Sequence, residues 1–364
     1  MKYYRNALLA LPLIFLAGCH SGSNTMKKQL PQPKADHVFS SAKLGKLYQE
    51  REKLQKEAFT LNYDGVQYEK VMFAEDITGQ QKVIRLVDRL GQTIDVYFPD
   101  AGVDTCGVYK EGNFYDAFEC KAAQRSVSNE TTLIQTTTSD RKLPIEFEFY
   151  TEALDYVTTL GSTVLTRSLQ DNKVTITTSF AFKAFYRYRF NKPAVGERIN
   201  STLGASTYSQ LFDIVKLSQG RDMTLKFDNH IGGSGDDEIN MYTGRMIHSN
   251  KMTTIVTPRG SVFSGGTDLF AAGYPRILQR ADTSKAIEQN KQVGVHSWGE
   301  GDKTAREFPY SDESHRSQAT YFNKVMGDKG IAFYMFTLNS APVSGAHWIT
   351  KADSDKYSFI TRIE

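Results

Sequence analysis

Neither sign of charge dominates this sequence, and that balance argues against a protein dedicated to binding nucleic acid. Among its 364 residues, 44 are Lys or Arg and 41 are Asp or Glu, which gives a formal net charge of +3 at pH 7. Nucleic-acid binders normally carry a clear basic excess. We therefore expect no nucleic acid among the partners.

Cysteine, histidine and tryptophan are also scarce. Three Cys are too few for a disulfide-dense scaffold or a Cys-rich zinc protein, and the seven His form no His-x-x-x-His pair. We therefore expect neither a metal site nor another cofactor. The aromatic content comes instead from 22 Phe and 19 Tyr, which favours strand-rich structure, and a hydrophobic share of 40% is enough to bury a core.

The N-terminal residues have the composition of a secretion signal. Basic residues precede the apolar run 7–17, which is too short to span a bilayer as a mature helix. The run ends in Leu16-Ala17-Gly18-Cys19, which resembles the lipobox of bacterial lipoproteins. The resemblance implies a lipoprotein signal peptide over residues 1–18 and a lipidated Cys19 that begins the mature chain.

Acyl chains such as palmitate on Cys19 would anchor a water-soluble body at a membrane surface. Because His20 rather than Asp follows the cysteine, resemblance to enterobacterial lipoproteins implies the outer membrane of the cell envelope, facing the periplasm. The polar residues 19–37 predict a flexible tether. An ordinary signal peptide with an incidental Cys19 is the alternative.

The two remaining cysteines, Cys106 and Cys120, lie close together in the chain. In an oxidising compartment such a pair predicts a disulfide bond. Two buried free thiols are the alternative.

The pattern of apolar residues divides the mature chain into two domains. Residues 38–190 predict a strand-rich α+β domain of unknown role, with a helix over 38–58 and then short runs that alternate with period two. The alternation reaches 180–190, where it predicts an aromatic sheet face. Over 195–364 expected strands and helices alternate, which predicts an α/β domain with a largely parallel sheet.

Two glycine-rich turns of the second domain carry candidate catalytic groups. In 227–235 an expected strand enters a Gly-Gly-Ser-Gly turn, where the N–H of Gly233 can approach a ligand closely. An expected strand, tight turn and small-residue helix around Ser264 would expose its hydroxyl, with the Gly265 amide as an oxyanion donor. The turn lacks the α/β-hydrolase elbow signature, because Val262 stands where that motif requires glycine.

His296 follows the apolar run 293–295 and completes an order that resembles the Clp protease and crotonase superfamily. In that superfamily a Gly-Gly turn supplies oxyanion amides, a serine begins a helix, and a histidine ends the next strand. The resemblance covers 195–364 and implies a ClpP/crotonase-like fold in which His296 activates Ser264. The positions that match are Gly232, Gly233, Gly260, Ser264, Gly266 and His296.

The catalytic Asp of the Clp-type proteases has no counterpart here, because Ala346 occupies the matching position. A third group would normally fix the tautomer of the histidine and stabilise its charged form. The spacing selects no single substitute. The candidates are Asp312, Glu313, His315, His347 and Asp353. The Ser264-Gly265-Gly266 triplet also resembles signal peptide peptidase A, which would pair the serine with Lys324, but the order of the motifs favours His296.

These features predict a membrane-anchored periplasmic serine hydrolase or peptidase that acts on a peptide or ester through Ser264 and His296. The missing acid supports a second hypothesis, a catalytically degenerate ClpP-like fold that serves as an envelope binding or scaffold protein. Acyl-thioester chemistry of the crotonase type ranks last, because coenzyme A is not expected outside the cytoplasm. The superfamily also implies a homo-oligomer.

Overall fold

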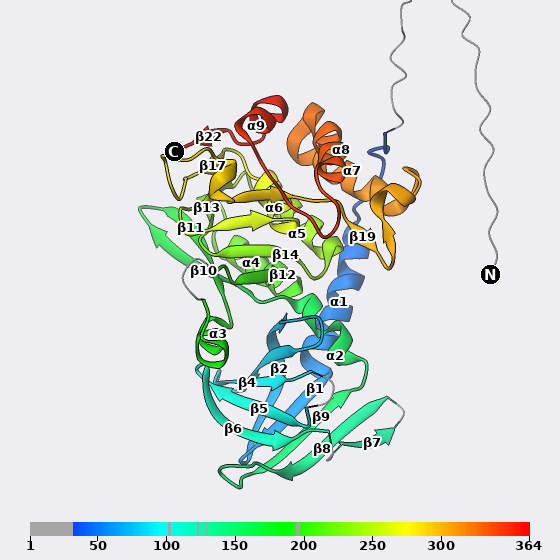
Figure 1. Ribbon diagram of the computed structural model, residues 1–364, viewed down its shortest axis with the longest axis vertical. Coiled ribbons are helices and arrows are strands. Elements are labelled where there is room, and N and C mark those ends of the chain that lie inside the picture. The colour runs from blue at the N-terminus through cyan, green and yellow to red at the C-terminus, as the bar shows by residue number, and fades with distance from the viewer. Residues whose placement is uncertain (1–31, 101–102, 122–123, 129, 194–196) are drawn as a thin grey trace, which may run out of the picture. The chain divides into compact units, whose positions relative to one another are not determined.

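The computed structural model describes residues 32–100, 103–121, 124–128, 130–193 and 197–364, which Figure 1 traces in colour. Helices and strands both make up large parts of these ranges, so the predicted α+β class is confirmed. The expected signal peptide, Cys19 and most of the expected tether lie outside the described residues. Residues 32–364 form one compact unit.

A long helix opens the described chain. It is α1 (Ser41–Glu57), which lies within the helix expected over 38–58. It begins where the Ser40 hydroxyl accepts a hydrogen bond from the Lys43 N–H at 3.1 Å, a standard N-terminal cap. Its partly buried apolar residues pack against the core of the first sheet: Leu44, Leu47, Tyr48 and Leu54.

Nine antiparallel strands follow α1 and form the first sheet, in the order β6-β5-β4-β3-β2-β1-β9-β8-β7. The period-two pattern is clearest in β9, where Ile145, Phe147 and Phe149 are buried and the residues between them are exposed. The strands are β1 (Phe59–Tyr63), β2 (Val66–Asp76), β3 (Lys82–Asp88), β4 (Thr93–Phe98), β5 (Thr105–Lys110), β6 (Asn113–Glu119), β7 (Gln124–Ser128), β8 (Thr131–Thr137) and β9 (Pro144–Tyr150).

Two further sheets are built mainly from parallel strands. The six-stranded sheet has the order β10-β11-β13-β15-β17-β22, and the five-stranded sheet has the order β12-β14-β16-β18-β21. Only the edge strands β10 and β21 run antiparallel to their neighbours. The strands of the six-stranded sheet are β10 (Thr163–Gln170), β11 (Lys173–Phe180), β13 (Asp222–Phe227), β15 (Thr253–Val256), β17 (Arg276–Leu278) and β22 (Arg362–Ile363). Those of the other are β12 (Asn200–Leu203), β14 (His230–Ser234), β16 (Ser261–Phe263), β18 (Val293–Val295) and β21 (His347–Trp348).

The change from the first sheet to the second lies earlier in the chain than the expected domain boundary at 190–195. The hairpin of β10 and β11 precedes that boundary, yet β11 pairs in parallel with β13. Val174 and Ile176 of β11 are buried in the core formed with the later strands. The hairpin therefore packs with the second half of the chain.

The prediction of a sheet face over 180–190 is wrong for residues 183–190, which form helix α3 (Lys183–Phe190). The Phe185 ring packs against Tyr97 and Tyr109 of the first sheet, with centroid distances of 5.6 and 4.7 Å. These contacts bury the aromatic side chains without a strand partner. Packing between distant segments thus decides the conformation here, against the local alternation.

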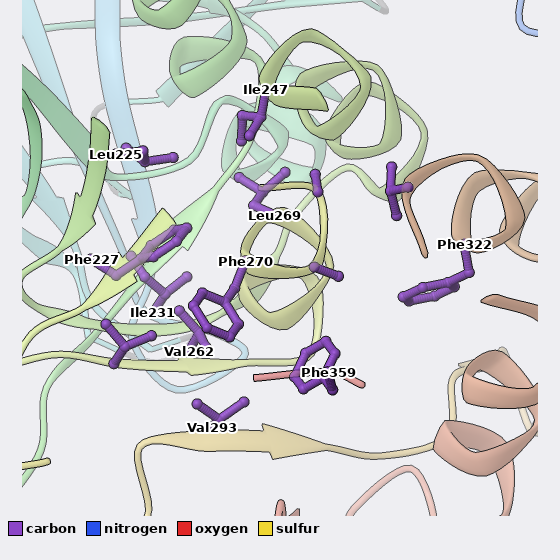
Figure 2. Packing of buried hydrophobic residues seen from close by; sticks show 14 of the residues in the cluster. Leu225, Phe227, Ile231, Ile247, Val262, Leu269, Phe270, Val293, Phe322 and Phe359 are labelled. Carbon is purple, nitrogen blue, oxygen red and sulfur yellow. The ribbon is translucent and has the colours of Figure 1, made fainter. Parts of the chain in front are cut away.

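Helices enclose the core of the two mixed sheets. Figure 2 shows Phe227, Ile231 and Val262 from the strands beside Leu269 and Phe270 of a short helix. That helix, α6, follows β16 directly and is packed within this core. The helices of this half are α4 (Ala205–Leu217), α5 (Asp237–Ser249), α6 (Gly265–Ala271), α7 (Glu313–Met326), α8 (Gly330–Ser340) and α9 (Lys351–Tyr357), and the short α2 (Ala153–Tyr156) follows the first sheet.

The last residues of the expected tether contact α7. Arg316 Nε donates to Asp36 at 2.7 Å, and the backbone N–H of His37 donates to the Thr320 hydroxyl at 3.0 Å. Residues 36–37 are therefore part of the packed structure and not of a free linker.

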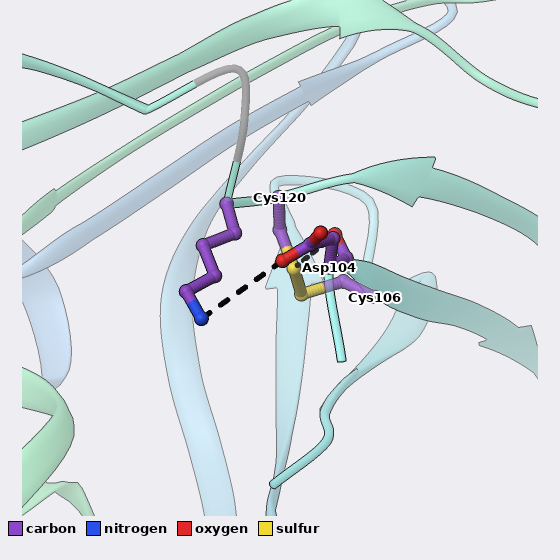
Figure 3. The surroundings of a disulfide bond; sticks show 4 residues. Asp104, Cys106 and Cys120 are labelled. Carbon is purple, nitrogen blue, oxygen red and sulfur yellow. Dashed lines mark hydrogen bonds and ion pairs between the residues drawn. A yellow bond between two sulfur atoms is a disulfide. The ribbon is translucent and has the colours of Figure 1, made fainter. Parts of the chain in front are cut away.

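A disulfide bond joins Cys106 of β5 to Cys120, which follows β6, with 5.6 Å between the two Cα atoms. The predicted pairing is confirmed. Both cysteines are buried, and the Cys120 N–H donates to the Asp104 carbonyl at 2.8 Å. Figure 3 shows the bond beside Asp104. The Asp104 carboxylate also forms an ion pair with Lys121 at 3.9 Å.

A buried carboxyl group links the first sheet to the five-stranded sheet. Glu75 of β2 accepts hydrogen bonds from the Ser162 hydroxyl and, at 2.9 Å, from the Thr202 hydroxyl of β12. Burial raises the pKa of Glu75 to about 7, although the two hydroxyl groups act in the opposite direction.

We expect the disulfide to contribute about 3 kcal/mol to stability, because closing a loop of this length restricts the unfolded chain. A Cys106→Ala/Cys120→Ala double variant should lower the free energy of unfolding in urea by about that amount. Wild type in reductant is the control and should unfold at the same lower urea concentration. Unchanged stability in both would contradict the prediction.

We expect Glu75 to make stability depend on pH. Its pKa in the folded state lies above the ordinary value of 4.5, so its contribution is complete below about pH 4.5 and is lost as the pH rises through 7. Relative to Glu75→Gln, wild type should lose up to about 3 kcal/mol across that window. Urea unfolding of both proteins from pH 4.5 to 8 measures the two free energies of unfolding. If both change with pH in the same way, the predicted effect of Glu75 is contradicted.

Candidate active site

Parallel pairing brings the predicted serine and histidine to neighbouring strand ends. The register of β16 and β18 pairs Phe263 with Gly294. Ser264 is the next residue after β16, and His296 is the next residue after β18. The Thr267 hydroxyl of α6 donates to the Gly294 carbonyl at 2.6 Å, which ties the helix that starts at Ser264 to the strand that carries His296.

Ser264 adopts a backbone conformation that is strained for a residue with a side chain. Its φ is 53° and its ψ is −123°, and it caps the N-terminus of α6. The tight strand-to-helix turn expected from the sequence is therefore present, although the glycine of the α/β-hydrolase elbow is absent. The Ser264 hydroxyl makes no hydrogen bond to a described residue.

Both predicted oxyanion glycines adjoin Ser264. As the first residue of α6, Gly265 has an N–H with no acceptor inside the helix. The buried Asn240 side chain donates to the Gly265 carbonyl at 3.0 Å and fixes the orientation of that residue. A Cβ on Gly265 would lie 2.7 Å from Ser234 Cβ, and a Cβ on Gly233 would lie 3.8 Å from Ser264 Oγ. Close packing therefore requires glycine at position 265, whereas a side chain at position 233 would only make ordinary contact with the serine.

A backbone carbonyl holds the histidine. His296 Nδ1 lies 2.7 Å from the Val343 carbonyl oxygen. Because a carbonyl only accepts, Nδ1 must carry a proton, and Nε2 of the neutral ring is then an acceptor. The ring also stacks on Phe263, with centroids 4.7 Å apart, and the Ser297 N–H donates to the Ala341 carbonyl at 2.9 Å beside it. No pattern in the sequence indicates this role for Val343, since every residue has the same backbone carbonyl.

Two of the candidate third residues, one that caps α7 and one within it, have structural partners other than His296. Asp312 caps α7 by accepting a backbone hydrogen bond at 2.9 Å. His315 is buried, and its ring nitrogens contact the Tyr334 hydroxyl and the Ala305 carbonyl, each at 2.8 Å. Neither residue is hydrogen bonded to His296.

The other candidates are also engaged elsewhere. His347 Nε2 lies 2.8 Å from Asp353 Oδ2, and the same carboxylate accepts from the N–H and hydroxyl of Thr350 at the start of α9. Glu313 contacts His37 Nδ1 at 2.5 Å. Among the described residues the only hydrogen-bond partner of the His296 ring is therefore the Val343 carbonyl.

Ser264 and His296 line one small pocket, although they are not hydrogen bonded to each other. The pocket offers about 40 Å³ to a water-sized molecule, so it admits the end of a ligand rather than a whole one. Its lining residues are Asp237, Ser264, Asp268, Val295, His296, Trp298, Gln318, Phe322, Tyr334 and Thr337.

Two carboxyl groups in this pocket were not among the predicted site residues. Asp268 lies one helical turn after Ser264, on the same side of α6, a spacing that could have indicated it. Burial, and then the neighbouring Asp237, raise the pKa of Asp268 well above its ordinary value. Desolvation and then Asp236 raise the pKa of Asp237 to about 6, although Asp237 retains solvent access. Neither Asp237 nor Asp268 has a side-chain hydrogen bond or ion pair with a described residue.

No protein-family model matches this chain, and no curated protein shows significant sequence similarity to it. Within the described ranges, no helix combines the length and apolar character needed to cross a membrane. The same part of the chain holds no group of three or more His, Cys, Asp or Glu side chains placed to bind a metal ion.

We expect Ser264→Gly to raise the free energy of unfolding by about 1 kcal/mol. Glycine adopts the observed φ without strain, and the gain is partly offset by the greater freedom of glycine in the unfolded chain. Ser264→Ala keeps the Cβ and is the matched control, so it should show no such gain. Urea unfolding of the three proteins measures the difference; equal stability of all three would mean that the turn stores no strain.

Proposed function

We propose that this chain is a serine hydrolase or peptidase of the cell envelope with a ClpP/crotonase-like C-terminal half. The observation that carries the proposal is the strained Ser264 beside His296, at the ends of two paired parallel strands and in one pocket. Residues with strained backbone conformations are found most often at functional sites, because the strain costs stability and is kept where the function needs that geometry. The substrate would be a peptide or an ester.

The proposed reaction uses the Ser264 hydroxyl and His296 Nε2, neither of which is hydrogen bonded to a described residue. His296 Nε2 accepts the Ser264 proton while Oγ bonds to the acyl carbon, and the oxyanion that forms is held by the N–H groups of Gly265 and Gly233. As the intermediate collapses, the bond to the leaving group breaks and His296 returns the proton to it. Water then attacks the acyl-serine by the same route and regenerates the hydroxyl.

The Val343 carbonyl would fix the tautomer of His296 but would not stabilise its charged form as a carboxylate does. A carbonyl carries a partial charge only, whereas the aspartate of a serine triad offsets the full imidazolium charge. We therefore expect turnover to be slow compared with enzymes that have a complete triad.

The parallel order of β12, β14, β16 and β18 supports the ClpP/crotonase-like part of the proposal. Helix α5 and then β15 lie between β14 and β16 in the chain, and α6 and then β17 lie between β16 and β18, with β15 and β17 in the six-stranded sheet. The glycine turn, the serine and the histidine thus occur in the order that the superfamily uses. We also propose that lipid on Cys19 holds the chain at the outer membrane.

A second function is favoured by one observation. His296 lacks a carboxylate partner, and its Nε2 is not hydrogen bonded to Ser264. A catalytically degenerate member of the same fold, acting as an envelope binding or scaffold protein, would show this arrangement.

A fluorophosphonate probe tests the nucleophile. We expect wild type to form one covalent adduct on Ser264, visible by intact mass and peptide mapping, and Ser264→Ala to form none. Loss of the base in His296→Ala should slow labelling at least about 100-fold, because general-base catalysis contributes that much.

Ser261→Ala is the matched control. Ser261 also contacts a histidine, with Oγ 2.8 Å from His230 Nδ1, but it is buried and lies outside the pocket. Labelling should be unchanged in this variant. Equal labelling of wild type and Ser264→Ala, or none at all, would favour the scaffold function instead.

A further inference from the structure

The pocket beside Ser264 contains two carboxyl groups and no lysine or arginine to pair with them. Asp237 and Asp268 both line it, and no Lys or Arg does. Two basic groups that contact residues beside Asp237 are already paired, since Arg51 Nε contacts Asp236 at 2.8 Å and Lys43 contacts Glu238 at 2.5 Å. A carboxyl group that is buried without a counter-charge is costly, so a ligand that supplies the charge would be bound favourably.

Asp268 is partly buried and lines the pocket. Its side chain has no hydrogen-bond or ion-pair partner among the described residues, and the protein packed around it raises the pKa of its carboxyl group well above the ordinary value. The backbone around it is fixed, because the Tyr321 hydroxyl donates to the Asp268 carbonyl at 2.6 Å. The backbone that carries the Asp268 carboxyl group is thus held in place, and its oxygen atoms remain available to accept hydrogen bonds from a ligand.

The other walls suit an organic cation and not a metal ion. The rings of Trp298, Phe322 and Tyr334 line the pocket, and aromatic rings attract ammonium groups while they also contact an attached alkyl chain. Two carboxyl groups are fewer than a metal site normally needs, and no third His, Cys, Asp or Glu of the described chain completes one. The small volume of about 40 Å³ favours a primary ammonium over a larger guanidinium.

A second groove continues from the pocket and gives a route for the rest of the ligand. It shares Asp237, Trp298 and Gln318 with the pocket and offers about 320 Å³. Its basic residues, Lys43 and His37, are each paired with a glutamate of the same groove. The groove can therefore hold a longer chain whose ammonium end enters the pocket.

From these observations we infer that Asp268 and Asp237 form a recognition site for a primary ammonium group on an alkyl chain, beside the Ser264 nucleophile. The assignment deepens the proposed hydrolase function and rests on it for the identity of the substrate, which would be a peptide or ester that carries a lysine side chain or a similar amine. Binding of the ammonium group itself does not need catalysis and can be measured separately.

Ligand-observed NMR titration of the full chain with n-butylammonium tests the site, with 1-butanol as the neutral ligand of the same chain length. We expect saturable binding of n-butylammonium at least tenfold tighter than that of 1-butanol. Asp268→Asn and Asp237→Asn should each weaken n-butylammonium binding at least tenfold and leave 1-butanol binding unchanged. Equal binding of the two ligands, or binding that both variants retain, would overturn the inference.

Asp328→Asn is the control for surface charge, because it makes the same substitution at an exposed position between α7 and α8. Its binding should equal that of wild type, and a loss as large as in Asp268→Asn would overturn the inference by showing a non-specific charge effect. If Asp268→Asn fails to fold, as judged by urea unfolding, Asp237→Asn alone decides the result.

Ser264→Ala separates this inference from the proposed function. It should bind n-butylammonium as wild type does, because the ammonium group contacts the carboxyl groups and not the serine. Fluorophosphonate labelling without n-butylammonium binding would remove the recognition site and leave the hydrolase proposal intact. Binding without labelling would support the recognition site and count against the hydrolase.

Discussion

The register of two short parallel strands determines where the candidate chemistry lies. β16 and β18 are three residues each, and their pairing of Phe263 with Gly294 sets Ser264 and His296 at adjacent positions beyond the strands. A shift of one residue would turn alternate side chains to the opposite face and bury the wrong ones. The register is secured by the buried Val262 and Val293 and by the hydrogen bond from Thr267 to Gly294. The pocket, the oxyanion glycines and the stacking of Phe263 on His296 all depend on this arrangement.

Local signals were sufficient where neighbouring residues alone decide the conformation. The glycines around Ser264 indicated a tight turn into a helix, and that turn is present. The spacing of Cys106 and Cys120 indicated a disulfide, which the structure contains. Local sequence patterns gave wrong predictions where contacts between segments far apart in the chain determine the conformation. Residues 183–190 alternate like a strand but form a helix, because Phe185 packs against tyrosines of the first sheet. The β10–β11 hairpin likewise pairs with a strand that follows it by some forty residues, and no local pattern indicates such a partner.

The candidate site shows the same division. Ser264 and His296 were identified because side-chain chemistry and glycine spacing mark them, and so were Gly233 and Gly265. Asp268 was missed although its position, one helical turn after Ser264, was available in the sequence. What distinguishes it from other acidic residues is its place in the pocket and the desolvation that raises its pKa, and both are properties of the fold. The five candidate third residues have suitable chemistry but are held by partners of their own: Asp312, Glu313, His315, His347 and Asp353.

The carbonyl that holds His296 has a consequence for how this site can change during evolution. Every amino acid supplies the same carbonyl at position 343, so substitutions of the exposed Val343 side chain leave the acceptor in place as long as the chain keeps its path. A histidine held in this way tolerates mutation at its partner position, unlike one held by an aspartate. The residue type at position 343 therefore need not be conserved for its carbonyl to orient the histidine. A comparison of related sequences would detect the serine and the histidine but not this carbonyl.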